Sequence, residues 1–256
     1  MHKPLSILSL FLLTGALAFT GACRTVSAKD REIAISHMEI SQQALAGGDA
    51  RTALAEIEKS VELNPKDPES RNLYGLLLHL YFGETDASIS QYRRAIALRP
   101  EYSEAKVNLS AAYIATDRCQ EALPLLEEAR RDLHYREPYL VENNLGWCKY
   151  KLGDVEGALR HLRSAVAINP GFCLGYRNLG EIMDQQGRLD EALRFVDRYA
   201  RACPEVADAD LRRGLLLLDK GDLFGARAAF LACMAKTTDD DLSDECGRHA
   251  ELIPEG

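Results

Sequence analysis

The residues in this 256-residue chain that are best suited to chemistry are its seven cysteines. Cys23 stands apart near the N-terminus, and the others are Cys119, Cys148, Cys173, Cys203, Cys233 and Cys246. In an oxidising compartment these six thiols can form three disulfides, although the sequence alone allows many pairings. The alternative is that they stay reduced and fill the core as small apolar side chains.

Residues 1–22 are predicted to be a lipoprotein-type signal peptide. Leu5–Phe19 is an apolar run that is too short to span a bilayer comfortably and has the length of a signal-peptide core. Thr20-Gly21-Ala22 stands directly before Cys23. Small residues before a cysteine resemble the bacterial lipoprotein box, which implies that Cys23 is acylated, with palmitate among its fatty acids. The alternative is ordinary signal cleavage after Ala18 or Ala28.

Arg24 follows the cysteine, where an aspartate would hold a lipoprotein at the inner membrane in enteric-type sorting. Resemblance to that rule implies an outer-membrane location, with the chain lipid-anchored and facing the periplasm. Several acyl chains on one cysteine give firm anchoring. Residues 23–31 are then a lipidated N-terminus and short linker.

The sequence holds no recognisable catalytic motif. There is no phosphate-binding loop, no GxSxG, no HExxH and no CxxC pair, and the six histidines do not cluster at ligand spacing. We therefore expect no enzyme activity, no cofactor, no metal and no small-molecule substrate. The net charge of −8 and the pI near 5.4 speak against nucleic-acid binding.

Small residues recur with a period that identifies the elements positioning these cysteines. Gly146, Gly180 and Gly214 are 34 residues apart. The same step relates Gly153, Gly187 and Gly221, and an alanine or serine series runs through Ala53, Ser88, Ala122, Ala158, Ala192 and Ala226. A 34-residue period is typical of tetratricopeptide repeats, each a pair of helices. The predicted fold is therefore all-α, a right-handed superhelical α-solenoid of about six tetratricopeptide repeats with a C-terminal capping helix.

The repeat domain is predicted to cover residues 32–253. Its repeats span about 34–67, 68–102, 103–138, 139–172, 173–206 and 207–240, and a terminal helix spans 241–253. The second repeat has one extra residue, which we place near Leu80–Gly83. Arg131–Pro138 is predicted to be a longer joint after the third repeat, which lacks the proline that closes other repeats at Pro65, Pro100, Pro170 and Pro204.

The geometry of helical pairs narrows the cysteine pairings. Cys233 and Cys246 lie almost symmetrically about an acidic turn, and Cys173 opens the fifth repeat that Cys203 closes. Cys119 starts the second helix of repeat three, and Cys148 lies late in the next helix. We expect three bridges in that order, with buried free thiols as the alternative.

The concave surface, lined by the first helix of each repeat, is the predicted partner-binding groove. Asn108, Asn144 and Asn178 are expected to form a ladder along it, either to grip the backbone of an extended peptide or to bond locally, two readings that remain open. Trp147, the only tryptophan, follows Gly146 and should face the groove. The remaining groove candidates are Tyr150, Lys151, Arg177 and Arg212, because aromatic and arginine side chains dominate binding energy.

The signal peptide, the lipobox-like Cys23 and the six repeats together resemble the type IV pilus biogenesis lipoproteins of the PilF/PilW/Tgl group. The resemblance covers nearly the whole mature chain and is most detailed in Glu142–Leu193, with Asn143-Asn144-Leu145-Gly146-Trp147-Cys148 and Ala167-Ile168-Asn169-Pro170-Gly171-Phe172-Cys173. Members of that family are outer-membrane pilotins. They help the secretin PilQ to insert and multimerise into the ring through which the pilus passes.

The resemblance implies an outer-membrane lipoprotein scaffold that binds a secretin subunit and promotes its insertion and multimerisation for type IV pilus assembly. The alternative function is a tetratricopeptide-repeat lipoprotein adaptor that recruits cell-wall enzymes or serves another envelope or secretion complex. An enzyme hidden in a helical scaffold is a remote third class. Fold alone does not choose among them.

Overall fold

The computed structural model describes residues 25–254, so the predicted signal peptide and Cys23 lie outside the described residues. The described chain forms thirteen helices and no strand. They are α1 (Ala28–Ala46), α2 (Ala50–Leu63), α3 (Pro68–Leu80), α4 (Thr85–Leu98), α5 (Ser103–Ala115), α6 (Cys119–Arg130), α7 (Pro138–Lys151), α8 (Val155–Ile168), α9 (Cys173–Gln185), α10 (Leu189–Ala202), α11 (Ala207–Asp219), α12 (Leu223–Lys236) and α13 (Asp240–Glu251).

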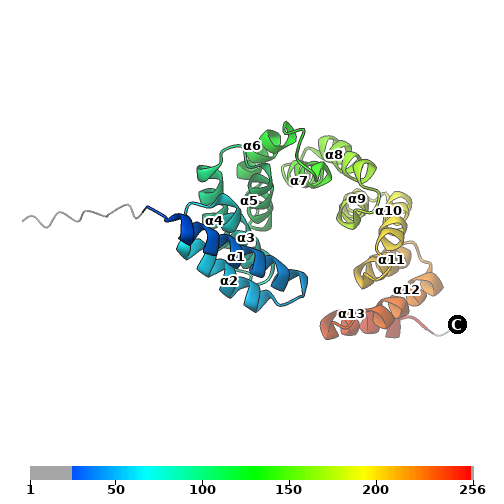
Figure 1. The fold of residues 1–256 in the computed structure, drawn as a ribbon. Coiled ribbons are helices and arrows are strands. Elements are labelled where there is room, and N and C mark those ends of the chain that lie inside the picture. The colour runs from blue at the N-terminus through cyan, green and yellow to red at the C-terminus, as the bar shows by residue number, and fades with distance from the viewer. Residues whose placement is uncertain (1–24, 255–256) are drawn as a thin grey trace, which may run out of the picture.

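The helices stack in sequence order along an arc (Figure 1). Odd-numbered helices from α3 onward lie on the inner side of the arc, and even-numbered helices lie on the outer side. Successive inner helices also contact one another, as α3 does with α5 and α5 with α7. This is the superhelical solenoid of tetratricopeptide repeats that the 34-residue period predicts.

The two helices of a repeat cross closely at the small residues. A Cβ placed on Gly146 would lie 2.7 Å from Leu162 Cγ and 3.0 Å from the Ala158 carbonyl oxygen. Two repeats carry serine at this crossing and use its hydroxyl. Ser41 Oγ donates to the Ala53 carbonyl at 2.7 Å. Ser110 Oγ donates to the Lys106 carbonyl of its own helix at 2.7 Å and lies 3.4 Å from the Ala122 carbonyl across the crossing. The periodic small residues are therefore packing requirements of the helical pair.

Turns and joints also follow the sequence pattern. Gly153, between α7 and α8, has a φ of +89°, a left-handed conformation that glycine adopts without strain. The extra residue of the second repeat lies in its turn, residues 81–84. Residues 131–137 form the longer joint that we predict after the third repeat, and α7 begins at Pro138. Pro65, Pro100, Pro170 and Pro204 each come two residues after the end of an outer helix.

The two ends of the stack differ from expectation in detail. The first helix begins at Ala28 rather than near residue 32, because Ser27 Oγ accepts a hydrogen bond from the Asp30 amide and caps it. The terminal helix α13 runs antiparallel to α12, with the ring of Phe230 stacked 5.0 Å from that of His249. Cys246, Ala250 and Ile253 are buried against Phe230 and Ala226, so α13 covers the last apolar face.

Candidate partner-binding groove

A pocket of about 270 Å³ lies on the inner surface, at the middle of the arc. Three consecutive inner helices form it, because α5, α7 and α9 turn the same repeat positions toward the concave side. Its lining residues are Ala111, Ile114, Ala115, Asn143, Asn144, Trp147, Leu174, Arg177 and Asn178. The alanines leave the volume open, while Trp147 and Leu174 supply apolar walls. The pocket can take one bulky apolar side chain of a partner, with amide and guanidinium groups at its rim.

Trp147 is half-buried in this pocket, in the register that its place after Gly146 predicts. Its ring centroid lies 5.5 Å from that of Tyr150, at an interplanar angle of 45°. Tyr150 also packs against the core formed by α8 to α11. Such an aromatic pair presents a large rigid contact area at little entropic cost.

The asparagines bond to one another across successive inner helices. Asn178 Nδ2 donates to Asn143 Oδ1 at 2.9 Å, and Asn143 Nδ2 donates to Asn144 Oδ1 at 3.1 Å. Asn108 Nδ2 donates to Asn72 Oδ1 at 3.0 Å. Of the predicted ladder, Asn178 is 3% exposed, so most of its side chain serves the contact between repeats. Asn144 lines the pocket, and its Oδ1 accepts the bond from Asn143.

Arg177 and Arg212 both turn toward one carboxylate. Asp208 Oδ2 accepts from Arg177 Nε at 3.2 Å, from Arg212 Nε at 2.9 Å and from the Tyr199 hydroxyl at 3.2 Å. Burial, followed by the charge of Asp208, raises the pKa of Tyr199 to about 12. Arg177 still borders the pocket, whereas Arg212 lies one repeat further along.

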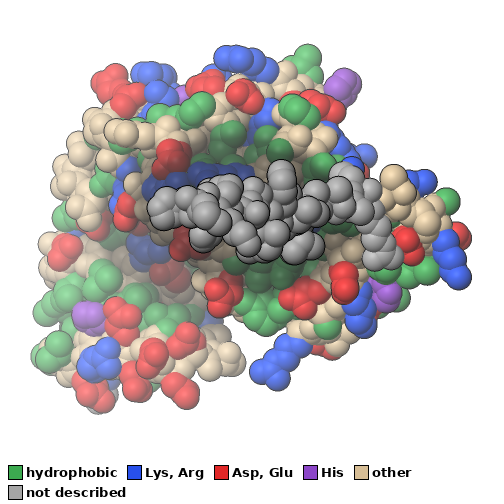
Figure 2. Space-filling model, turned by 90° about the vertical axis from the view of Figure 1, so that its left-hand side faces the viewer, with side chains coloured by type: hydrophobic (Ala, Val, Ile, Leu, Met, Phe, Trp, Pro, Cys, Tyr) green, Lys and Arg blue, Asp and Glu red, His purple; other side chains and the backbone are tan. Residues whose placement is uncertain are grey.

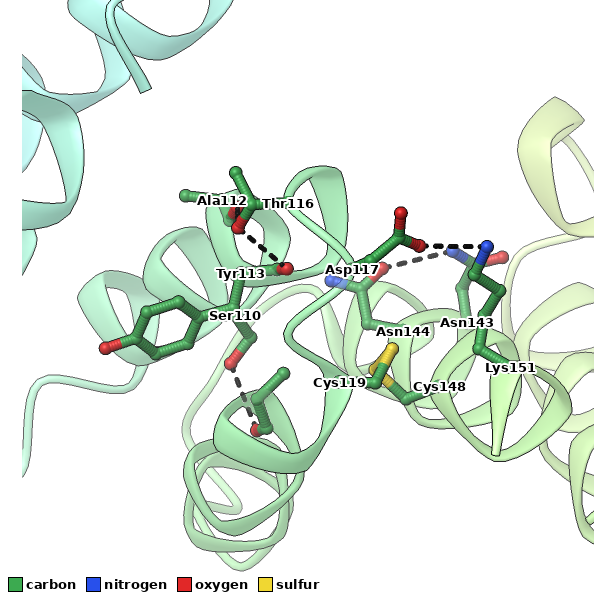
Figure 3. Close-up of a disulfide and its surroundings, with 11 residues drawn as sticks. Ser110, Ala112, Tyr113, Thr116, Asp117, Cys119, Asn143, Asn144, Cys148 and Lys151 are labelled. Atoms are coloured by element: carbon green, nitrogen blue, oxygen red, sulfur yellow. Dashed lines mark hydrogen bonds and ion pairs between the residues drawn. A yellow bond between two sulfur atoms is a disulfide. The ribbon is translucent and has the colours of Figure 1, made fainter. Parts of the chain in front are cut away.

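Four of the predicted groove residues therefore line one pocket: Asn144, Trp147, Arg177 and Asn178. The other four, Asn108, Tyr150, Lys151 and Arg212, lie around it without lining it. Lys151 is exposed and pairs with Asp117 at 2.9 Å, at the end of α7 (Figure 3).

A disulfide fixes α7 beside this pocket. Cys148 directly follows Trp147 and is bonded to Cys119, with Cα atoms 5.1 Å apart (Figure 3). The other bridges are Cys173–Cys203 and Cys233–Cys246, at Cα separations of 6.0 and 6.2 Å. The structure thus pairs the six cysteines in the order expected from the helical pairs. Because Cys119 starts α6, the first bridge ties the second helix of one repeat to the first helix of the next.

A polar stretch of the groove toward the N-terminus was not predicted. Two adjoining pockets, of about 620 and 640 Å³, share Arg99, Tyr102, Glu104 and Arg136. Partial removal from water raises the pKa of Glu104, with Glu137 and Glu69 acting in the same direction against the hydrogen bond from Asn72. Glu69 and Glu104 occupy the same repeat position, so the period could have revealed them. Arg136 belongs to the long joint, for which the period gives no register.

Charges on the surface are mixed. Figure 2 shows the side of the molecule carrying the N-terminal end, where basic and acidic side chains are interspersed around the rim. Among residues 25–254, no three His, Cys, Asp or Glu side chains gather in a way that could hold a metal ion. No helix in the same range is both long and apolar enough to cross a bilayer.

Known proteins resemble this chain at the level of the repeat. Among curated proteins, the TPR repeat-containing protein YpiA of Bacillus subtilis is 27% identical over 161 residues, which are 62% of this chain and 37% of YpiA. The cellulose synthase operon protein C of Xanthomonas axonopodis pv. citri is 27% identical over 199 residues, 74% of this chain and 13% of that protein. The chain thus spans well under half the length of either relative.

Two solved structures match over nearly their full length. PilW, described as a widely conserved type IV pilus biogenesis factor, superposes with a TM-score of 0.73 at 21% identity, covering 84% of this chain and 98% of PilW. Pseudomonas aeruginosa PilF superposes with a TM-score of 0.67 at 17% identity, covering 86% of this chain and 99% of PilF. At these identities the likeness establishes a shared fold.

The repeat architecture has its own sequence signature. A family model for the tetratricopeptide repeat matches residues 29–201, and a second model with the same description matches residues 185–239. The first of them alone covers more than half of the sequence. The chain belongs to the tetratricopeptide repeat family.

Proposed function

We propose that this chain is an outer-membrane lipoprotein that binds a secretin subunit in its groove and promotes secretin insertion and multimerisation for type IV pilus assembly. The observation that carries the proposal is the whole-length superposition on PilW and PilF, which leaves almost no part of either protein uncovered. A superposition that extends over the full stack supports a shared use of the concave surface. The predicted acyl anchor at Cys23 supports the location.

The groove suits a binding role. Its central pocket combines a rigid aromatic wall, a guanidinium and an amide, which is the composition of an interface hot spot. The inner helix α7 is held to α6 by the Cys119–Cys148 bridge and to α9 by the bond between Asn178 and Asn143, so little entropy is lost on binding. A lipid anchor would add to this by keeping scaffold and secretin on one surface, which raises their effective concentration.

The decisive experiment is a deletion strain in the native bacterium, with heat-resistant secretin multimers measured on a gel. We expect multimers to be lost, and to return when the full chain is supplied. A chain carrying Trp147→Ala should restore them poorly although it accumulates to a normal level. Normal multimers in the deletion strain would contradict the proposal, and co-purification of cell-wall enzymes in their place would favour the adaptor function.

Location is tested separately. Labelled palmitate should enter the wild-type chain and be absent from Cys23→Ser, and the labelled chain should fractionate with the outer membrane. A mature chain found without acyl groups in the soluble fraction would contradict the lipid anchor. The experiment on secretin multimers would still test the binding role of the groove.

A further inference from the structure

The outer face of α12 is unlike the outer faces of other repeats. Phe224, Ala228, Leu231 and Ala235 are spaced by four, three and four residues, so they form one stripe along the helix. All four are exposed, and Phe224 is 71% accessible to solvent. A stripe of four exposed apolar residues is unusual on the surface of a soluble domain.

The 34-residue period supplies an internal control for this stripe. The same four positions carry Asp190, Arg194, Asp197 and Arg201 on α10; they carry Glu156, Arg160, Arg163 and Ala167 on α8, and Arg51, Ala55, Glu58 and Glu62 on α2. In each of these three repeats at least three of the four positions carry a charged residue, which keeps this face of the helix solvated. The sixth repeat has no charge at any of the four, so the stripe is a specific feature of α12 and not of the repeat.

The stripe is complementary to itself. When two copies of α12 pack antiparallel about a two-fold axis near residue 229, Phe224 of each copy meets Ala235 of the other. Leu231 then meets Ala228. Each large side chain faces a small one, which is how ridges fit between two helices. Parallel packing would place Phe224 on Phe224 and leave the alanines facing a gap.

The neighbouring outer helix, α10, is also complementary to itself in this arrangement, through charged side chains. α10 precedes α12 on the outer side of the arc (Figure 1). The same two-fold relation places Asp190 opposite Arg201 and Arg194 opposite Asp197. Acid meets base throughout, whereas parallel packing would bring like charges together. The side chain of Arg194 is 69% exposed, and its ion pair with Glu191 is long, at 3.9 Å. Asp190 and Asp197 also pair within the chain, with Lys220 and Arg213, so the contact between copies would add a second partner to each acid.

We propose that the outer face of the fifth and sixth repeats binds a second copy of this chain, with the two α12 helices antiparallel. A lipid surface is a poorer occupant, because the adjacent helix α13 begins with Asp240, Asp241 and Asp244 and would be repelled by anionic headgroups. We expect a contact confined to the outer faces of α10 and α12 to give a dimer of the transient class, which forms reversibly. The concave groove stays open in it.

The first test is sedimentation equilibrium of the mature chain with Cys23→Ser, which cannot be acylated and keeps every residue of the fold. We expect a concentration-dependent monomer–dimer equilibrium. Phe224→Asp, which copies Asp190 of the preceding repeat, should weaken the dimer by at least about tenfold. Leu133→Asp is the matched control, because Leu133 is 94% exposed in the joint before α7 and should leave the equilibrium unchanged.

Charge reversal tests the orientation. Arg194→Asp and Asp197→Arg should each weaken the dimer, and the double variant should restore it, because the swapped pair is again complementary across the axis. Circular dichroism shows whether each variant keeps its helices. Cross-linking gives a second reading: a mixture of Phe224→Cys and Ala235→Cys chains should form a disulfide dimer that neither chain forms alone.

Other outcomes would overturn the inference. A chain that stays monomeric at all concentrations, or a dimer unaffected by Phe224→Asp, excludes this face as the contact. Cross-linking of the Phe224→Cys chain with itself would indicate parallel packing. Flotation with phosphatidylglycerol vesicles by a monomeric chain, lost in Phe224→Asp, would assign the stripe to lipid.

Discussion

Asn178 on α9 donates a hydrogen bond to Asn143 on α7, and the two atoms, Nδ2 and Oδ1, are 2.9 Å apart. Both side chains are at most 3% exposed. The bond joins the first helices of two repeats at the wall of the groove. At this position the side chain neither bonds within its own helix nor points to a partner: it holds two neighbouring repeats together, an arrangement that neither reading of the asparagine ladder anticipated.

Asn178→Ala is expected to lower the free energy of unfolding by about 1–3 kcal/mol, because it leaves a buried acceptor on Asn143 without a donor. Urea unfolding of this variant, of Asn143→Ala and of the double variant gives the coupling between the two residues. Gln42→Ala, an exposed amide on the inner surface, is the control. A coupling near zero would show that the bond adds nothing to stability.

Trp147→Ala is expected to weaken binding of the partner by about 2 kcal/mol, since a central aromatic residue in a pocket carries a large share of interface energy. Helicity should change little, because the side chain is half-buried and faces the groove. Calorimetry with a soluble secretin fragment measures the first effect and circular dichroism the second. Tyr81→Ala removes an exposed aromatic residue in the turn before α4 and should bind normally.

Gly214→Ala is expected to destabilise the fold by about 1–3 kcal/mol through overpacking. The added Cβ would lie 2.4 Å from Phe230 Cε1, and the fully buried ring has no room to withdraw. Gly180→Ala should cost less, because the nearest atom there is Val196 Cγ2 at 3.1 Å. Gly171→Ala meets only Asn169 Oδ1 at 3.5 Å and serves as control. Thermal unfolding that ranks the three in another order would contradict this account.

Reduction of the disulfides is expected to destabilise the C-terminal part of the stack. In the loop-entropy account, the bridges at separations of 29 and 30 residues contribute about 3–4 kcal/mol each, and the 13-residue bridge contributes about 3 kcal/mol. Urea midpoints measured with and without reductant give the total contribution of the three bridges to stability. Paired Cys→Ala variants give the contribution of each bridge. Equal midpoints in both conditions would mean that the thiols are reduced in the isolated protein.

Glu104→Gln is expected to raise the melting temperature slightly at neutral pH, by less than about 2 °C. The pKa of Glu104 is raised in the folded state, chiefly by loss of hydration, so the folded protein binds this proton more tightly than the unfolded chain does. The ionised carboxylate therefore opposes folding above that pKa, and its cost disappears as the pH falls. Melting curves from acid to neutral pH should converge at the acid end. Melting curves that diverge at acid pH would contradict the predicted direction of the effect of Glu104 on stability.

The sequence alone was sufficient for the fold because the helical pairs cross at positions where only small residues fit. Gly146 and Ala158 show that constraint, and so does Ser110, whose hydroxyl lies 3.4 Å from the Ala122 carbonyl of the helix that it crosses. The start of α1 could not be predicted from the periodic small residues. It depends on the Ser27 cap, which lies before the first repeat and has no periodic counterpart.

The site was predictable in part. Trp147 faces the groove because its position after Gly146 fixes its direction on the helix. The partners of the asparagines depend on how far one repeat rotates against the next, a quantity that the period does not contain, and Asn143 was missed for that reason. Arg136 was missed because the joint before α7 has no counterpart in other repeats.

The three bridges all lie beyond residue 118, and residues 25–118 contain no cysteine. In a stack where each unit touches only its neighbours, a pulling force is transmitted in series. Tension applied between residue 25 and a load held in the central pocket would pass through α1 to α4, which only non-covalent contacts hold together. Those four helices would extend first, while the disulfide-bonded part of the stack stayed folded and kept the load bound.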